Sequence, residues 1–206
     1  MICDYLKVFS QNVQKNLLIV NTIFETWTDF NIIFIQELLW STIYMISSAS
    51  NQEGKILVGI THYPNWLLFA RTPLSQSDTP RVLVYINIRL SSLCFSLWNN
   101  IIHYKDILLI SFINNYVCSF IMNVYSDSSH SALKYLKDTE VNVSNMLIMT
   151  GNFNIRDSLW DPSFLYHSSI SDNLIIIADS FNLNLSTQLT SCPLDTLILT
   201  VNLTQL

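Results

Sequence analysis

One stretch, residues 146–162, constrains the fold more than any other part of the chain. It reads Met-Leu-Ile-Met-Thr-Gly-Asn-Phe-Asn-Ile-Arg-Asp-Ser-Leu-Trp-Asp-Pro. The apolar run that begins it is typical of a short strand buried on both faces, and we expect Gly151 to lead the chain into a turn. If the backbone then stays extended, Asn152 and Asn154 point to one side and Phe153 points into the core. The pattern predicts a sheet that presents two amide side chains at its edge.

Length and composition predict one domain with a large core and no membrane span. The chain has 206 residues, of which 50% are hydrophobic and 12% are charged, a balance that favours buried strands. A span needs about 20 mostly apolar residues, and the best candidate, residues 31–46, carries Gln36 and Glu37 at its centre. The N-terminus lacks a secretory signal pattern, so we expect an intracellular protein, with nucleus and cytoplasm both open.

Cysteine spacing and charge exclude several classes of protein. The four cysteines lie far apart without a Cys-x-x-Cys pair, so we expect free, mostly buried thiols rather than a zinc site or a disulfide framework. The formal net charge of −5, with scattered basic residues, argues against broad electrostatic capture of nucleic acid. A nuclease can still work with this balance if metal ions supply local positive charge, but we do not expect tight nonspecific binding of nucleic acid.

Strand and helix patterns alternate along the chain, which predicts an α/β fold. Residues 81–90 alternate strongly and predict a long strand with one wetter face. A helix over residues 131–140 joins two strands as a right-handed crossover, which brings Tyr125 and the end of the Met146 strand to the same edge. The other predicted strands are 6–9, 31–36, 56–60, 107–112, 118–125 and one that starts at Leu183; the other helices are 13–24 and 172–181.

Polar residues fall where these strands end. Asn12 lies between a strand and a helix, and taken alone it is more often a helix N-cap than a functional residue. Glu37 lies where a strand with four apolar residues ends, and in isolation it is more often a solvated strand end than a metal ligand. Tyr125 ends its strand, and in isolation it reads as an ordinary strand aromatic. His62 lies in an aromatic-rich turn, where packing is the simpler interpretation.

These motifs together resemble a known family. Gly151-Asn152-Phe153-Asn154 resembles the Gly-Asp-Phe-Asn signature of the endonuclease/exonuclease/phosphatase superfamily, and the residues that follow are similar to fungal retroelement-type members. Gln11-Asn12-Val13 and Ile35-Gln36-Glu37 resemble the first motif and the metal-binding Glu motif of the same superfamily. The resemblance covers roughly residues 7–186.

The resemblance implies a DNase I-like fold, a four-layer α-β-β-α sandwich of two mixed sheets. Residues 1–186 form the endonuclease-like domain under this interpretation, and residues 187–206 form a divergent tail that leaves the sandwich incomplete at the C-terminus. If the tail supplies no strand, a neighbouring strand becomes an exposed edge and the protein aggregates. Leu197 to Val201 could instead pair as a replacement strand.

The implied function is magnesium- or manganese-dependent hydrolysis of a phosphodiester, such as nicking DNA for a retroelement. In this interpretation Glu37 and Asn12 hold the metal ion, while Asn154 and Tyr125 orient the phosphate. Asn152 stands where the superfamily has the Asp that orients and deprotonates the attacking water. The substrate is DNA or another phosphodiester.

Two departures from the superfamily leave a second hypothesis open. An amide at Asn152 can hydrogen-bond a water but cannot accept its proton. The superfamily also ends on a strand with a His, whereas the four His of this chain lie at positions 62, 103, 130 and 167, none of them in the tail. The alternatives are therefore a weakly active hydrolase and a non-catalytic remnant of one, with a membrane-associated hydrophobic protein as a distant third.

Overall fold

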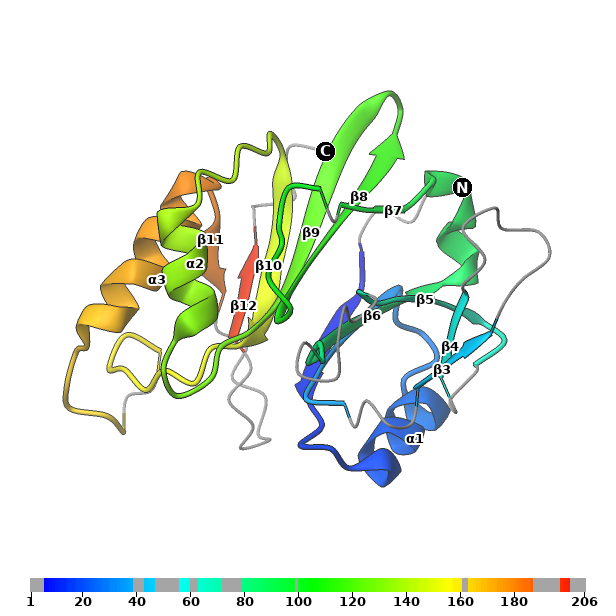
Figure 1. The fold of residues 1–206 in the computed structure, drawn as a ribbon, viewed down its shortest axis with the longest axis horizontal. Coiled ribbons are helices and arrows are strands. Elements are labelled where there is room, and N and C mark those ends of the chain that lie inside the picture. Colours follow the sequence, from blue (N-terminus) through cyan, green and yellow to red (C-terminus); the bar gives the residue numbers. More distant parts are fainter. Residues whose placement is uncertain are drawn as a thin grey trace.

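Two facing β-sheets form the centre of the protein, and helices cover their outer faces (Figure 1). The computed structural model describes residues 6–38, 43–46, 56–59, 63–71, 79–98, 100–160, 163–186 and 197–200. The first sheet has four strands in the order β1-β2-β6-β5, and the second has six in the order β11-β12-β10-β9-β8-β7. Strands β3 and β4 form a separate two-stranded ribbon. The predicted four-layer α-β-β-α sandwich is confirmed.

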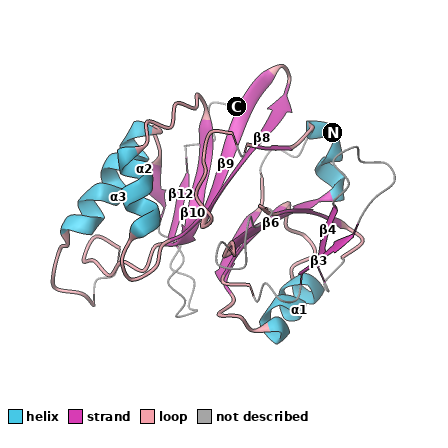
Figure 2. Ribbon diagram, viewed as in Figure 1, coloured by secondary structure: helices cyan, strands magenta, loops and turns pink. Residues whose placement is uncertain are grey.

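The elements follow the expected alternation (Figure 2). The helices are α1 Leu17–Thr26, α2 Ser131–Asp138 and α3 Ser169–Ser180, with a 3₁₀ helix at Ile88–Leu93. The strands are β1 Val8–Asn12, β2 Ile32–Gln36, β3 Ile43–Ile46, β4 Ile56–Gly59, β5 Trp66–Phe69, β6 Val82–Asn87, β7 Ser96–Leu97, β8 Ile107–Asn114, β9 Val117–Tyr125, β10 Met146–Asn152, β11 Asn184–Ser186 and β12 Leu197–Thr200.

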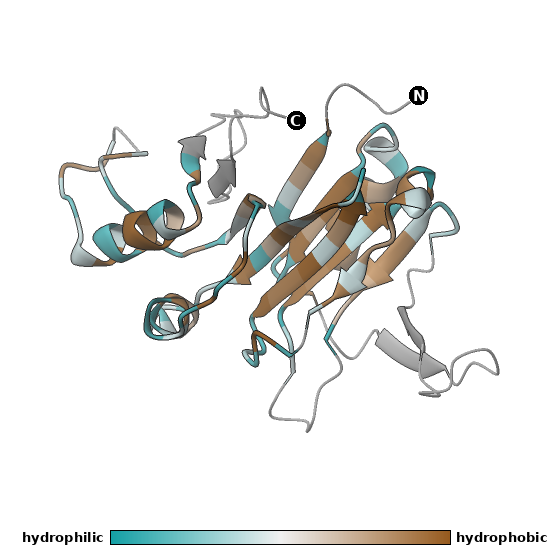
Figure 3. Ribbon diagram, turned by 90° about the horizontal axis from the view of Figure 1, so that it is seen from above, coloured by the Kyte–Doolittle hydropathy of each residue, from teal (hydrophilic) through white to brown (hydrophobic). Residues whose placement is uncertain are grey.

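An apolar core lies between the two sheets, and Figure 3 shows much of the strand ribbon in the brown of hydrophobic residues. The expectation of a wetter face on residues 81–90 was wrong, because every residue of β6 is buried. Val84 and its neighbours two residues away pack between the sheets, while Leu83 and Tyr85 pack under α1. Alternation in the sequence reflected two different apolar environments rather than one dry and one wet face.

Helix α1 covers the outer face of the first sheet. Its buried residues Val20, Ile23 and Phe24 recur at helical spacing and pack against the outward side of β2 and β6. Asn16 caps the helix, since its side-chain oxygen accepts a hydrogen bond from the Leu18 N–H. The alternative interpretation of Asn12 as the N-cap is therefore wrong, and Asn12 is the last residue of β1.

Helices α2 and α3 cover the outer face of the second sheet and form its separate core with β8, β9 and β10. Strand β9 leads through α2 to β10, and the two strands pair in parallel, with Tyr125 opposite Asn152. The predicted crossover thus brings both strand ends to one edge. Gly151 stays inside β10 instead of leading into a turn. Its φ is 153°, and a Cβ at this position would lie 1.8 Å from the Val124 carbonyl oxygen, so the close approach of β9 requires glycine.

The C-terminal strand β12 lies between β10 and β11 and pairs antiparallel with both. The alternative that residues near 197–201 pair as a replacement strand is confirmed for Leu197–Thr200. As a result, β10 has a partner on each side. The edge that the sequence placed at risk is covered.

Three other expectations concern single residues or the membrane. Cys94 is exposed and Cys118 is half-buried, so these two free thiols do not follow the expectation of burial. Cys3, Cys192 and His62 lie outside the described residues. None of the helices within the described ranges has the length and apolarity needed to cross a bilayer.

Candidate functional site

The predicted site residues lie at one edge of the sandwich, called here the polar rim: Asn12, Glu37, Tyr125, Asn152 and Asn154. Asn12 ends β1 and Glu37 directly follows β2 in the first sheet, and these strands pair in parallel with Asn12 opposite Gln36. Tyr125 and Asn152 end the parallel strands β9 and β10 of the second sheet. Parallel pairing places the carboxyl ends of the strands together in each sheet.

Glu37 is the centre of the polar rim. Its Oε2 accepts a hydrogen bond from Asn12 Nδ2 at 2.8 Å, and its Oε1 accepts one from the Tyr125 hydroxyl at 2.8 Å. Tyr125 belongs to the second sheet and Asn12 to the first. The carboxylate of Glu37 therefore connects the two sheets where their strands end.

Backbone hydrogen bonds hold Glu37 in an unusual conformation. Its φ is 54°, in the left-handed region that residues other than glycine seldom adopt. Its N–H donates to the Arg81 carbonyl at 2.7 Å, and its carbonyl accepts from the Lys15 N–H at 2.7 Å. The chain thus leaves β2 sharply and turns the Glu37 side chain toward Asn12 and Tyr125.

Tyr125 is a neutral hydrogen-bond donor at the polar rim. Burial, followed by the hydrogen bond to Glu37 and the negative charge of Glu37, raises the pKa of Tyr125 to about 12. The Arg81 guanidinium lies 4.3 Å from the centre of the Tyr125 ring and opposes this shift, as does a hydrogen bond from Asn154. The phenol keeps its proton at neutral pH and can donate it in a hydrogen bond to an oxygen of a ligand.

Asn152 and Asn154 form a local turn instead of an extended pair. We expected an extended backbone here, with both side chains on one side. Asn154 instead has a φ of 51°, so that expectation was wrong. The Asn152 Oδ1 accepts the Asn154 N–H at 3.0 Å, and the Asn154 Nδ2 donates to the Ser126 carbonyl. Short amide side chains favour such turns because they hydrogen-bond the backbone two residues on. Asn154 reaches Tyr125 through this turn, and Asn152 is buried beneath it.

Arg81 and Asp106 adjoin the polar rim, although the sequence did not point to them. Arg81 Nε donates to Asp106 Oδ1 at 2.8 Å, and its Nη2 pairs with Asp106 Oδ2 and lies 3.5 Å from Asp127 Oδ2. Asp106 is fully buried, and Arg81 is 27% exposed. The place of each residue in the sequence could have pointed to it. Arg81 directly precedes β6 and Asp106 directly precedes β8, and each of these strands runs antiparallel to a strand that ends at the polar rim.

The side chains of the polar rim present oxygen atoms of the kind that magnesium prefers as ligands. A carboxylate has about four acceptor positions, so the two hydrogen bonds to Glu37 leave both of its oxygens able to bind a cation. Within the described part of the chain, Asn12 Oδ1 accepts one hydrogen bond, from the Gln14 N–H, and an amide oxygen has a second lone pair. Within the described ranges, however, no three His, Cys, Asp or Glu side chains gather in a way that could hold a metal ion. One carboxylate with amide oxygens and water matches the hard oxygen ligands that magnesium prefers.

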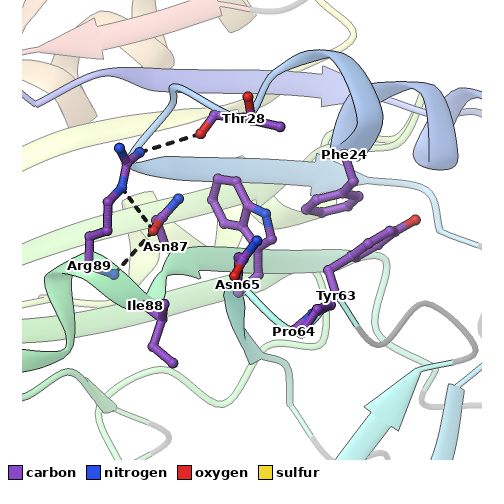
Figure 4. A pocket seen from close by; sticks show the side chains of 9 residues that line it. Phe24, Thr28, Tyr63, Pro64, Asn65, Asn87, Ile88 and Arg89 are labelled. Carbon is purple, nitrogen blue, oxygen red and sulfur yellow. Dashed lines mark hydrogen bonds between the residues drawn. The ribbon is translucent and has the colours of Figure 1, made fainter.

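A hollow of about 500 Å³ lies at the opposite end of the first sheet (Figure 4). Its walls include Phe24, Tyr63 and Trp66, and Arg89 lies at one side. Trp66 pairs with Asn87 at the far end of β6, whereas Glu37 bonds to Arg81 just before β6 begins. The hollow is therefore separate from the polar rim.

No protein-family model matches this chain, and no curated protein matches it. Among solved structures, the chain is similar to the endonuclease domain of TRAS1, a telomere-specific non-LTR retrotransposon, with 13% identity and a TM-score of 0.59 over 96% of this chain and 85% of that one. It is also similar to an endonuclease/exonuclease/phosphatase family protein from Leptotrichia buccalis, with 11% identity and a TM-score of 0.49 over 95% and 88% of the two chains. A third similar structure is the human Nocturnin catalytic domain, with 11% identity and a TM-score of 0.46 over 92% and 75%.

The similarity to the TRAS1 endonuclease domain extends over nearly the whole chain and includes both sheets. At this level of identity, the shared property is the fold. The chain therefore has the DNase I-like α/β sandwich fold.

Proposed function

We propose that the polar rim is a site of slow, magnesium-dependent phosphodiester hydrolysis. One observation carries the proposal: the Glu37 carboxylate is held by Asn12 from its own sheet and by Tyr125 from the facing sheet, each at 2.8 Å. A carboxylate fixed in this way at the end of the sandwich is a preorganised cation ligand. The similarity in fold to a retrotransposon endonuclease domain supports nucleic acid as the substrate.

Each residue has a defined role in this proposal. Glu37 and Asn12 hold the magnesium ion, which when bound supplies charge that stabilises the phosphate and the leaving oxygen. Tyr125 donates a hydrogen bond to a phosphate oxygen, since its raised pKa keeps it protonated. Asn154 orients the same phosphate from beside Tyr125. Asn152 orients the attacking water but cannot take its proton, and a positioned acid or base contributes about 10²–10⁴-fold to rate.

A second candidate function is a non-catalytic domain that retains the fold. Asn152 favours it, because its side-chain oxygen already accepts the Asn154 N–H and its amide has no basic site. Binding of a phosphodiester without hydrolysis is the activity that such a domain would keep.

Nicking of supercoiled plasmid separates the two candidates. We expect slow nicking in magnesium that disappears in EDTA and in Glu37→Gln. Glu140→Gln is the matched control, because Glu140 is an exposed carboxylate just after α2. Nicking that persists in Glu37→Gln would assign the activity to another site or to a contaminant. Complete absence of nicking at high enzyme concentration would leave the non-catalytic candidate.

A further inference from the structure

Two buried amides connect the sheets directly below the polar rim. Gln36 ends β2 and Asn123 lies in β9, and both are fully buried. Gln36 Nε2 donates to Asn123 Oδ1 at 2.7 Å. Asn123 Nδ2 in turn donates to the carbonyls of Ile35 at 3.1 Å and Leu83 at 2.8 Å. A single side chain of the second sheet is thereby bonded to two strands of the first.

The position of this amide pair ties it to the site. Gln36 immediately precedes Glu37, and Asn123 precedes Tyr125 by two residues on the same face of β9. The link thus joins the same two strand ends as the hydrogen bond between Glu37 and Tyr125. At the polar rim itself, the sheets are also joined by the bond between Tyr125 and Glu37 and by the contacts of Arg81 with Asp106 and Tyr125. The buried residues between the sheets are otherwise mostly apolar, and apolar packing has no directional preference. Hydrogen bonds are directional, and in a buried, low-dielectric setting they hold their partners closely.

The pair is also a costly way to fill a core. Gln36 Oε1 is buried and has no hydrogen-bond partner among the described residues. A buried polar atom without a partner is unfavourable, and apolar side chains of similar size would avoid that cost. Because one polar atom of this link has no hydrogen-bond partner, the link is better explained by the relative position of the two sheets that it fixes than by the stability that it adds.

We propose that Asn123 is a positioning residue that sets the relation of the two sheets at the polar rim, and so places Tyr125 on Glu37. The inference rests on the proposed function in one respect: the position of the Glu37 carboxylate affects activity only if Glu37 binds the metal ion. Asn123 acts through Gln36 and through the carbonyls of Ile35 and Leu83. It is itself buried below the polar rim and touches no substrate.

The test compares Asn123→Leu and Gln36→Leu with Ile121→Ala. Ile121 lies on the same face of β9 and packs in the same core between the sheets, but carries no polar link. Two quantities are measured in folded protein: the magnesium dissociation constant by calorimetry with magnesium chloride alone, and the separation of Tyr125 Oη from Glu37 Oε1 in crystal structures. We expect both Leu variants to lengthen the 2.8 Å contact beyond hydrogen-bond distance and to weaken magnesium binding at least tenfold. Ile121→Ala should lower the melting temperature while leaving both quantities unchanged.

Several results would overturn the inference, and each can be distinguished from a result that refutes the proposed function. Asn123→Leu with an intact contact and unchanged magnesium affinity would reduce the amide pair to a stability element, as would an equal effect in Ile121→Ala. If Asn123→Leu does not fold, Gln36→Leu tests the part of the link next to Glu37, because it removes the bond to Asn123 while the Asn123 bonds to both carbonyls still join the sheets. A wild-type protein that neither binds magnesium nor nicks DNA would refute the function alone, and the crystallographic separation would still decide the positioning role.

Discussion

Glu37 concentrates strain and hydrogen bonding at a single residue. A non-glycine residue in the left-handed region costs on the order of 1–3 kcal/mol, and Glu37 adopts it with a φ of 54°. Four hydrogen bonds, two to its backbone and two to its carboxylate, maintain this conformation. Such strain persists where neighbouring structure enforces it, and here it directs the carboxylate at the polar rim.

Magnesium binding should be weak and should depend on Glu37. The expected reason is that a single carboxylate carries the charge of the site while the other side chains of the polar rim are neutral. Calorimetric titration with magnesium chloride should give a low-affinity isotherm that Glu37→Gln abolishes and Glu140→Gln preserves. Tight binding that survives Glu37→Gln would place the metal ion elsewhere in the protein.

Restoring a carboxylate by Asn152→Asp should raise nicking only slightly. The full contribution of a positioned base is roughly 10²–10⁴-fold, and we expect less because residues 187–206 contain no His, whereas the sequence resemblance implies one in the last strand. The Asn152 oxygen that accepts the Asn154 N–H is retained in Asp, so the turn should persist. The measurement is the initial nicking rate in magnesium, with Asn152→Ser as a control for loss of the amide. A strongly active Asn152→Asp enzyme would mean that the tail His is dispensable.

At the scale of elements, the sequence predicted where strands end better than what surrounds them. The apolar runs before Glu37 and Tyr125 located both residues correctly, since strand length and the first polar residue are local properties. The double burial of β6 and the link between Gln36 and Asn123 were missed because each depends on a partner at least 40 residues away. Arg81 was missed because its partners Asp106, 25 residues along the chain, and Tyr125 come close to it only when the strands are paired.

Strand β10 should tolerate no side chain at position 151. In Gly151→Ala, the new Cβ would meet the Val124 carbonyl oxygen at 1.8 Å, so β9 and β10 must separate. We expect a loss of about 3 kcal/mol or more in the free energy of unfolding, from backbone strain and broken strand pairing together. Urea unfolding measures it, with the volume-conserving Met149→Leu as the control in the same strand. A loss of under about 1 kcal/mol would contradict the close approach of the two strands.

Hydrogen bonds to Asp157 stabilise the segment between β10 and α3. This buried carboxylate accepts the Leu159 N–H at 2.9 Å, the Ser168 N–H at 2.7 Å and the Ser171 hydroxyl, and His167 lies beside it. Burial alone would raise the pKa of Asp157, but these hydrogen bonds, led by that of Ser171, lower it below its usual range. The charged form therefore stabilises the folded state above pH about 4, the ordinary value for Asp. This contribution is lost as pH falls further and Asp157 binds a proton in the folded state.

The Asp157→Asn variant should accordingly be less stable at neutral pH and less sensitive to acid. The amide cannot accept all of these hydrogen bonds, and an unsatisfied buried donor costs about 1–3 kcal/mol. Urea midpoints from pH 7 to pH 2 provide the measurement, with the exposed Asp138→Asn on α2 as the control. A variant whose stability falls with acid as steeply as that of the wild type would show that another group produces the acid dependence.

At the scale of the whole molecule, short strands form the two borders of the second sheet among the residues that the structure describes. Strand β7 has two residues and β11 has three, and they flank the longer apolar strands β8, β9 and β10. Short edge strands limit pairing with other chains, which matters for a protein with 50% hydrophobic residues and a net charge of only −5. Strand β12 completes this arrangement because it separates β10 from the border.

Removal of β12 should therefore cause the protein to aggregate. A chain that ends at Ser186 loses the antiparallel partner of β10, whose residues from Ile148 to Gly151 pair with β12. The freed N–H and C=O groups lie on an apolar strand and can template pairing with a second copy. A chain that ends at Thr200 retains β12 and is the matched control. Light scattering and sedimentation at tens of micromolar should find the longer chain monomeric and the shorter one aggregated, whereas a monomeric, cooperatively unfolding 1–186 protein would show that the sandwich closes without β12.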